Sequence, residues 1–225
     1  IDVPFQGFLD TLGGLFAGHA VACTPPILDA PPAPAASPRT IDGAGAPPLP
    51  TAVQDDTGWT TVGDGVELRR VAVRDDARLL VERLLVVRLD PARVRFDVGY
   101  APGAPRALDA WQADSGALLV VNGGFFTEDY DATGLVVSDG ATHGVSYGPF
   151  AGMFAVTEAG PDVRWLGARP YDPSEPLRAA LQAFPMLVRP GGEVGVVEAD
   201  DLPARRTWIG QDRQGRVLVG VAPSG

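Results

Sequence analysis

Lysine is absent from this chain of 225 residues, and all 18 of its positively charged side chains are arginine. A bias that extends over the whole chain is typical of amino-acid usage rather than of a function. The 28 acidic side chains leave a formal net charge of -10. This surplus argues against non-specific binding to nucleic acid or to anionic membrane surfaces. It does not exclude an anionic substrate, because a local basic site can lie on an acidic protein.

Cysteine and histidine are also scarce. The single cysteine, Cys23, excludes an internal disulfide framework and a metal site built from several cysteines. The two histidines, His19 and His143, lie far apart and in dissimilar sequence contexts. A zinc site would therefore have to be built largely from carboxylates, which is unfavourable. We expect no metal and no other cofactor.

Long apolar runs are missing as well. No segment approaches the roughly 18 uninterrupted apolar residues of a membrane span, so no transmembrane helix is predicted. The first 50 residues hold 10 of the 22 prolines, and residues 24–50 are rich in proline, alanine and glycine. Such a composition is typical of an extended tether. We expect residues 1–50 to form a poorly ordered leader and tether, and residues 51–225 to form one folded domain.

The leader contains a sequence that is similar to a lipoprotein cleavage site, Ala20-Val21-Ala22-Cys23. However, no Arg or Lys precedes Arg39, and Asp10 and His19 interrupt the apolar stretch, so the layout of a signal peptide is missing. One interpretation is a membrane tether lipidated at Cys23. The other, which the sequence favours, is a poorly ordered or partner-dependent segment with an ordinary cysteine.

Short apolar stretches dominate the chain from residue 66 onward. Residues 107–115 have helical spacing, with Ala107, Leu108 and Trp111 on one face and Gly116 placed to end the helix. A second short helix is expected at residues 176–184. Strands are predicted at residues 66–73, 79–89, 94–98, 118–121, 134–138, 153–157, 163–166, 186–188, 193–197, 207–211 and 217–221. The expected fold is α+β, with a β-dominated mixed sheet of many short strands and a few helices.

The most informative motif follows the apolar run at residues 118–121. Asn122 ends the run and is followed by Gly123, Gly124, Phe125 and Phe126. Glycine suits a chain that turns sharply or comes close to a ligand, and an asparagine adds a donor and an acceptor. The motif alone favours a tight hairpin at Asn122-Gly123. The alternative is a binding site at the end of a strand.

Several further segments, taken in order along the chain, resemble one family. They are Gly65-Val66, Leu89-Asp90-Pro91, Val121 to Phe126, Thr133 to Gly140, Phe184 to Val188 and Arg205 to Asp212. Over about Trp59 to Gly225 this ordered set resembles the phosphodiester glycosidase family. Its members include an animal enzyme that removes N-acetylglucosamine from a mannose 6-phosphate diester, and bacterial members related to exopolysaccharide.

The resemblance implies a hydrolase that cleaves a sugar-1-phosphodiester, with a carbohydrate or a sugar phosphodiester as its partner. It implies an extracytoplasmic setting, which is secreted, periplasmic or at the cell surface. The alternative is a non-catalytic polysaccharide-binding or surface-interaction domain. Family members usually continue into a second glycine-rich block of the Leu-Asp-Gly-Gly type, where this chain has Pro223-Ser224-Gly225. We therefore expect a further segment or a second chain to complete the domain, and no aspartate of that block is assigned.

The resemblance and the chemistry together select the candidate site residues. Breaking the bond at an anomeric centre often uses two carboxyl groups, whereas a phosphate leaving group needs an anion cradle more than a proton. The predicted catalytic residues are Asn122, Asp129 and Arg206. The predicted substrate-binding residues are Gly123, Gly124, Phe126, Thr133, Gly134, Thr207 and His143.

Each of these candidates has a plainer alternative. The alternative to a phosphate-binding Arg206 is an arginine in an ordinary ion pair. If Arg205 and Arg206 lie in one strand, Arg205 is expected to point away from the site. Asp129, with Glu128 and Asp131, supplies an acid, base or nucleophile, or belongs to a solvated acidic loop. His143 assists near neutral pH or has no role. Tyr130 and Tyr147 stack on a sugar or only pack, and Asp212 is expected in a hairpin turn.

Overall fold

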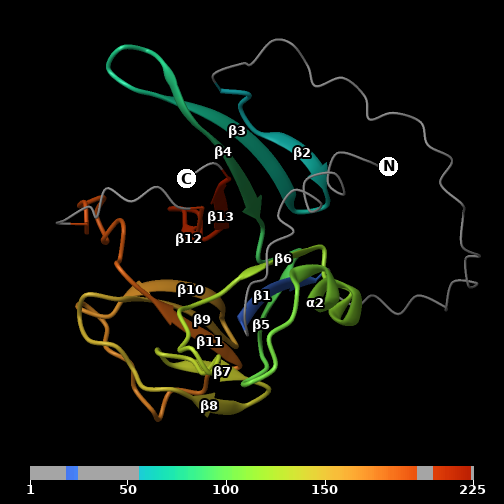
Figure 1. The fold of residues 1–225 in the computed structure, drawn as a ribbon, viewed down its shortest axis with the longest axis vertical. Helices are drawn as coiled ribbons and strands as arrows, with labels where there is room; N and C mark the ends of the chain where they lie inside the picture. The colour runs from blue at the N-terminus through green and yellow to red at the C-terminus, as the bar shows by residue number, and fades with distance from the viewer. Residues whose placement is uncertain (1–18, 25–55, 197–204, 224–225) are drawn as a thin grey trace, which may run out of the picture.

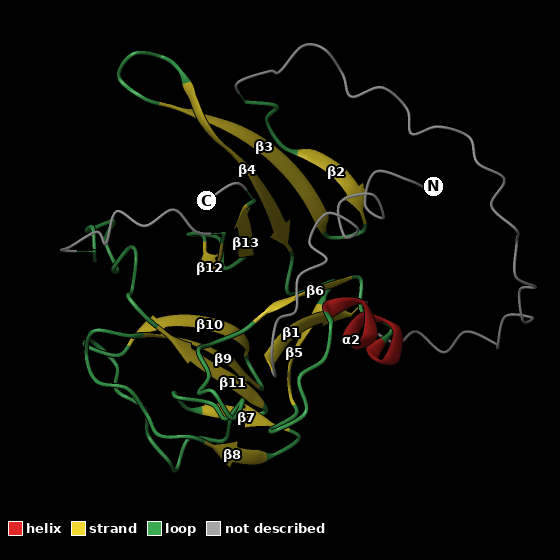
Figure 2. Ribbon diagram, in the orientation of Figure 1, coloured by secondary structure: helices red, strands yellow, loops and turns green. Residues whose placement is uncertain are grey.

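The computed structural model describes residues 19–24, 56–196 and 205–223, and for residues 19–24 it describes the backbone alone. The described part is β-dominated, as predicted, with one α-helix (Figure 2). The elements are β1 (His19–Thr24), β2 (Thr60–Gly63), β3 (Val66–Arg74), β4 (Leu80–Leu89), β5 (Arg95–Tyr100), α2 (Leu108–Ser115), β6 (Leu119–Asn122), β7 (Val136–Ser138), β8 (Ala141–His143), β9 (Gly152–Thr157), β10 (Gly160–Trp165), β11 (Ala179–Ala183), β12 (Arg206–Gln211) and β13 (Val217–Ala222).

The strands form three sheets. Two have five strands, in the orders β12-β13-β4-β3-β2 and β10-β9-β11-β7-β8, and the third has the order β5-β1-β6. In Figure 1 the small sheet and α2 lie between the two larger sheets. Every pairing between the described strands is antiparallel, so the expectation of a mixed sheet is wrong for this part of the chain.

The main core lies where the three sheets face one another. On β5, Phe96 and Val98 are buried and Arg95 is exposed, as the alternation of side chains along a strand requires. Phe96 meets Phe154 of β9 edge-on, with ring centroids 6.0 Å apart. Burying an aromatic or aliphatic side chain of this size stabilises the fold by about 1.5–3 kcal/mol. These contacts therefore tie the small sheet to β9.

The helix α2 covers the other face of the small sheet. It ends as predicted at Gly116, whose φ of 63° is left-handed and whose N–H donates to the carbonyl of Gln112 over 2.9 Å. Trp111 of α2 packs on Gly99 of β5, where a Cβ atom would lie 2.7 Å from the indole ring. Leu108 and Trp111 also pack against Val120 of β6. The absence of a side chain at Gly99 thus lets the helix approach the sheet.

The second predicted helix, at residues 176–184, is wrong. Residues 179–183 instead form β11, which lies between β9 and β7. Ala179, Ala180, Leu181 and Gln182 are all buried in succession. A central strand with both faces covered has this pattern, and a short apolar run cannot be distinguished from a buried helix by its periodicity. The predicted strands at residues 186–188 and 193–197 reduce to one bridge, between Val188 and Val194, and residue 197 lies outside the described residues.

The strand β1 lies within the segment that was expected to be a poorly ordered leader. It runs between β5 and β6, with Ala20 opposite both Gly99 and Asn122. For residues 19–24 the expectation of disorder is therefore wrong, because their backbone completes a sheet. The other residues of the 1–50 segment lie outside the described residues, and the division at residue 50 stays a prediction. Within the described part of the chain, no helix is long and apolar enough to cross a membrane.

Candidate functional site

The small sheet brings two strand ends to the same place. β5 and β6 both run antiparallel to β1, so Tyr100 and Asn122, their last residues, lie at one end of this sheet. The tight hairpin at Asn122-Gly123 does not form, because the next strand, β7, pairs with β11 and β8 in another sheet. The Asn122 motif is therefore a strand end from which the chain crosses between sheets.

Asn122 lines a small cavity together with the beginning of β12. The cavity has a volume of about 30 Å³, which is room for about one or two water molecules. We call it the Asn122 cavity, and its lining residues are Leu108, Val121, Asn122, Arg205, Arg206, Thr207 and Val221. Two motifs that lie far apart in the sequence, Asn-Gly-Gly and Arg-Arg-Thr, thus meet across the ends of β6 and β12.

Two guanidinium groups belong to this cavity. Arg205 lies just before β12, so strand alternation does not turn it away, and both Arg205 and Arg206 line the cavity. Both side chains are exposed, and Nη1 of Arg206 donates a long hydrogen bond of 3.4 Å to the carbonyl of Arg205. Among the described residues neither arginine has a carboxylate partner. As far as the described residues are concerned, the guanidinium N–H groups of Arg205 and Arg206 are thus available to an anion.

The two glycines after Asn122 serve a close approach. A Cβ atom at Gly124 would lie 2.7 Å from the carbonyl oxygen of Gln182 in β11, so Gly124 presses against protein backbone. The N–H groups of Gly123 and Gly124 have no hydrogen-bond partner among the residues that the structure describes. Successive free backbone N–H groups can bind an anion. The two glycines therefore combine a packing role with free donors beside Asn122.

The acidic segment after the glycines forms an exposed turn. The N–H of Thr127 donates to the carbonyl of Asp131 over 2.8 Å, and Tyr130 takes a left-handed φ of 66°. Asp129 is exposed at this turn and is not among the described residues that line the Asn122 cavity. Phe126, which pairs with Ala132 in a bridge, stacks its ring on Tyr130 with centroids 5.9 Å apart. The structure thus places Phe126 and Asp129 in one loop, and neither lines the Asn122 cavity.

Thr133 and Gly134 both contact Tyr147. The Thr133 and Tyr147 hydroxyl groups are hydrogen-bonded to each other. A Cβ atom at Gly134 would lie 2.4 Å from the Tyr147 ring, so the ring occupies the space that a side chain would need. The Tyr147 N–H donates to Oε1 of the buried Gln182 over 2.7 Å. The direct role of Thr133 and Gly134 in this structure is to hold Tyr147.

His143 lies beside the same end of the small sheet. Its ring contacts that of Tyr100 at a tilt of 54°, with ring centroids 4.7 Å apart, and the Tyr100 hydroxyl accepts a hydrogen bond of 3.1 Å from the Ala132 N–H. Tyr100 and Asn122 end neighbouring strands on either side of β1. The contact with Tyr100 therefore brings β8 towards the end of the sheet where Asn122 lies.

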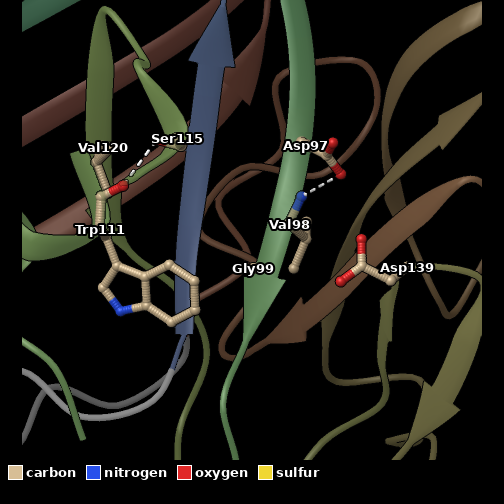
Figure 3. Close-up of a pocket in the computed structure, with 7 residues that line it drawn as sticks. All are labelled: Asp97, Val98, Gly99, Trp111, Ser115, Val120 and Asp139. Atoms are coloured by element: carbon tan, nitrogen blue, oxygen red, sulfur yellow. Dashed lines mark hydrogen bonds between the residues drawn. The ribbon is translucent and has the colours of Figure 1, made fainter. Parts of the chain in front are cut away.

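A larger cavity of about 190 Å³ lies on the helix-covered side of the small sheet. Figure 3 shows β1 running between Trp111 and Val98, with the carboxyl groups of Asp97 and Asp139 beyond Val98. We call it the Asp97 cavity. Neither of these two carboxylates was predicted from the sequence as a site residue. The sequence signal for Asp97 was its position between Phe96 and Val98 in an alternating strand, and that position also predicts an ordinary solvent-exposed side chain.

Asp212 has a structural role, as its position in a hairpin turn predicted. Its carboxylate accepts hydrogen bonds from the N–H groups of Gln214 and Arg216 and pairs with Nε of Arg216 at 2.7 Å. Burial raises the pKa of Asp212, but the hydrogen bonds from Arg216 and Gln214 outweigh it and leave the pKa below its ordinary value. Among the described residues, no group of three or more His, Cys, Asp or Glu side chains is placed to hold a metal ion.

A family model described as phosphodiester glycosidase matches residues 115–224, which confirms over these residues the family resemblance found in the sequence. The matched range begins at the end of α2 and includes Asn122, Arg206 and every other candidate site residue. A comparison with curated proteins finds no match.

Proposed function

We propose that the chain is a hydrolase which cleaves sugar-1-phosphodiesters, because residues 115–224 match the phosphodiester glycosidase family model. The observation that carries the proposal is the Asn122 cavity, where an amide and two arginines from distant parts of the chain meet. A pair of guanidinium groups is a suitable site for a phosphodiester. The N–H groups of Gly123 and Gly124, which follow Asn122 in the chain and have no partner among the described residues, offer further donors.

The proposed step breaks the bond between the anomeric carbon and its oxygen. Water supplies the new oxygen at the anomeric carbon, its proton passes to solvent, and the phosphate monoester departs with the bonding electron pair. Because a phosphate monoester is a weak base, its departure depends on electrostatic stabilisation more than on a proton donor. Arg206, aided by Arg205, is proposed to bind the leaving phosphate, while Asn122 and Thr207 orient it.

A transition state with oxocarbenium character also calls for a carboxyl group. The described residues offer Asp129 in the exposed turn, and Asp97 and Asp139 in the Asp97 cavity. Asparagine variants at the three positions separate these candidates. The substitution that removes the required carboxyl group is expected to lower kcat far more than either of the other two.

The setting proposed for this activity is extracytoplasmic, with residues 25–50 acting as an extended linker. A sugar phosphodiester on a surface glycan or an exopolysaccharide is the proposed substrate class. The proposal is supported by the composition of residues 24–50, which is typical of an extended linker.

The first experiment identifies the bond that is broken. The full chain is incubated with an N-acetylglucosamine-1-phosphodiester in water labelled with ¹⁸O, and the products are examined by mass spectrometry. The proposal expects the label in the released sugar and an unlabelled phosphate monoester. A label in the phosphate would make the protein a phosphodiesterase, and the absence of turnover would contradict a hydrolase of this type.

The second experiment tests the role of Arg206. Removing one donor that stabilises a developing anion lowers kcat by about 10²–10³-fold, and we expect Arg206→Ala to fall in this range. Arg206→Lys should recover part of the loss, because it keeps a charge but not the bidentate fork. Arg213→Ala is the matched control, since Arg213 is an exposed arginine at the opposite end of the same hairpin. Equal activity in Arg206→Ala and Arg213→Ala would contradict the proposed role.

A second candidate function is a non-catalytic polysaccharide-binding module. One observation favours it, since no carboxylate is found among the described residues that line the Asn122 cavity. Saccharide binding without hydrolysis in the labelled-water experiment would support this function over the first.

A further inference from the structure

Four aromatic side chains gather beside the Asn122 motif. Phe184, which follows β11, lies at the centre, with its ring centroid 4.6 Å from Phe125, 5.2 Å from Tyr147 and 5.4 Å from Phe150. Tyr147 and Phe150 are 5.8 Å apart. We call Phe125, Tyr147, Phe150 and Phe184 the aromatic cluster. These separations are those at which aromatic rings attract one another.

The cluster is exposed to an unusual degree. Phe125 is 47% exposed, Phe150 55% and Phe184 40%, while the phenylalanines of the core, Phe96 and Phe154, are almost fully buried. A single exposed apolar residue needs no explanation, but a contiguous apolar patch on a protein surface marks a binding site. Three neighbouring phenylalanines with this exposure therefore point to a ligand that covers them.

The cluster is held in place by buried polar contacts. Gln182, which is 1% exposed, accepts the Tyr147 N–H over 2.7 Å and donates from Nε2 to the Ser146 hydroxyl over 3.0 Å. The Thr133 hydroxyl binds the Tyr147 hydroxyl, and Gly134 leaves room for the ring. Hydrogen bonds of this kind fix the side chains of a binding surface before a ligand arrives. The surface is thus preformed.

The cluster also lies within reach of the Asn122 cavity. Phe125 is three residues after Asn122 in the chain, and three residues of extended chain span at most about 11 Å. Gly124, between them, is packed against the Gln182 carbonyl, which ties this short segment to β11 just before Phe184. One ligand with a phosphate and sugar rings can therefore touch both the arginines and the aromatic rings.

We propose that the aromatic cluster is a saccharide-binding platform, which receives a sugar ring of the substrate while the phosphate lies at Arg205 and Arg206. The inference rests on the proposed function for the identity of the ligand. A sugar ring has an apolar face of C–H groups that can cover a phenyl ring, and a rim of hydroxyl groups. The hydroxyl pair of Thr133 and Tyr147 at the edge of the cluster supplies polar partners for that rim.

The experiment measures binding by the full chain with three probes, which are inorganic phosphate, N-acetylglucosamine 1-phosphate and the neutral disaccharide N,N′-diacetylchitobiose. Calorimetry or NMR titration gives the affinity for each. Phe150→Ala is expected to weaken both saccharide probes about tenfold and to leave phosphate unchanged. Arg206→Ala should weaken phosphate and the sugar phosphate but not the disaccharide. Val145→Ala is the control, because Val145 is 76% exposed and does not belong to the aromatic cluster.

The outcomes separate the platform from the proposed function. If Phe150→Ala leaves all three affinities unchanged, or if the wild type binds no saccharide, the platform is overturned even where phosphate still binds. If the disaccharide binds through Phe150 but the chain hydrolyses no phosphodiester, the platform stands and the proposed hydrolase fails. Self-association of the wild type that Phe150→Ala abolishes, measured by light scattering, would instead make the cluster a contact between protein chains and would overturn the inference.

Discussion

Single residues set the geometry of the candidate site through close approaches that leave no room for a methyl group. Gly124 is the clearest example, because a Cβ atom there would collide with the Gln182 carbonyl. The N–H groups of Gly123 and Gly124 have no hydrogen-bond partner among the described residues. A backbone carbonyl in a central strand cannot move aside as the end of a flexible side chain can. The position therefore couples the Asn122 motif to β11.

This coupling predicts that Gly124→Ala is destabilising. The added Cβ atom would lie 2.7 Å from the Gln182 oxygen, so either the loop or β11 must shift, at a cost of about 1–3 kcal/mol in the free energy of unfolding. Urea denaturation measures the change. Gly63→Ala is the control, because its Cβ atom would meet Val66 at an ordinary 3.6 Å, and it should alter stability by less than about 0.5 kcal/mol. Equal effects of the two substitutions would contradict this account.

At the scale of elements, one ion-pair network joins β10 to the loop before β11. Arg164 of β10, with a side chain that is 4% exposed, binds both carboxylate oxygens of Glu175, at 2.7 and 3.1 Å. Arg169 bridges Glu175 and Asp162 at 2.7 and 2.9 Å. Arg164 also pairs through Nε with Asp162 at 3.0 Å. Because Arg164 is buried, its charge depends on both carboxylates, and chiefly on Glu175, which it contacts with two nitrogens.

Removing that carboxylate is therefore expected to be costly. Glu175→Gln leaves a buried guanidinium with a weaker partner, and we expect a loss of about 3 kcal/mol in the free energy of unfolding. Glu193→Gln is the matched control, since Glu193 is 65% exposed where it pairs with Arg189, and such pairs contribute about 0–1 kcal/mol. Chemical denaturation measures the free energy of unfolding of both variants. A smaller loss of stability in Glu175→Gln than in Glu193→Gln would contradict the importance of the network.

The same network predicts a pH dependence. The hydrogen bond from Arg164 lowers the pKa of Glu175 below its ordinary value of about 4.3. A carboxyl group whose pKa is lower in the folded state stabilises the fold at higher pH, and this contribution is lost as the pH falls towards the folded pKa. The free energy of unfolding of the wild type should thus decrease below about pH 5, and Glu175→Gln should decrease less steeply. Parallel curves for the two proteins would exclude Glu175 as the source.

On the scale of the whole molecule, the hairpin of β3 and β4 extends away from the sheets, as Figure 1 shows. The chain at and before β2 pairs with β3 as far as the bridge between Asp56 and Val71, and β13 pairs with β4 only from Leu85 onward. Beyond Val71 the hairpin therefore has two open edges among the described strands. Leu79 and Val81 near its tip are 66% and 60% exposed. Open edges with apolar side chains favour association between chains.

We therefore expect the double substitution Leu79→Ser and Val81→Thr to reduce self-association without destabilising the fold. The two side chains contact no part of the core, so the free energy of unfolding should change by less than about 0.5 kcal/mol per site. Light scattering at increasing protein concentration, beside urea denaturation, measures both quantities. A loss of stability well beyond this range would show that the hairpin tip is packed against another part of the protein.

The elements with a local signal could be predicted from the sequence. The helix at residues 107–115 with its end at Gly116, the strand before Asn122 and the hairpin turn at Asp212 depend on neighbouring residues, and the structure confirms them. β11 was mistaken for a helix because its burial on both faces comes from β7 and β9, which lie elsewhere in the chain. β1 was mistaken for part of a leader for the same reason, since its partners β5 and β6 begin far along the sequence.

The sequence by itself determined the resemblance to the phosphodiester glycosidase family, the β-dominated class and the residue types at the candidate site. Only the tertiary structure decided that Asn122 meets Arg205 and Arg206, that Gly134 serves Tyr147, and that four aromatic rings come together. The physical reason is that motifs and strand periodicity are local properties of the chain. The proximity of β6 and β12 at the Asn122 cavity, and that of Phe125 and Phe184, arise from the packing of separate sheets, which local residue patterns do not encode.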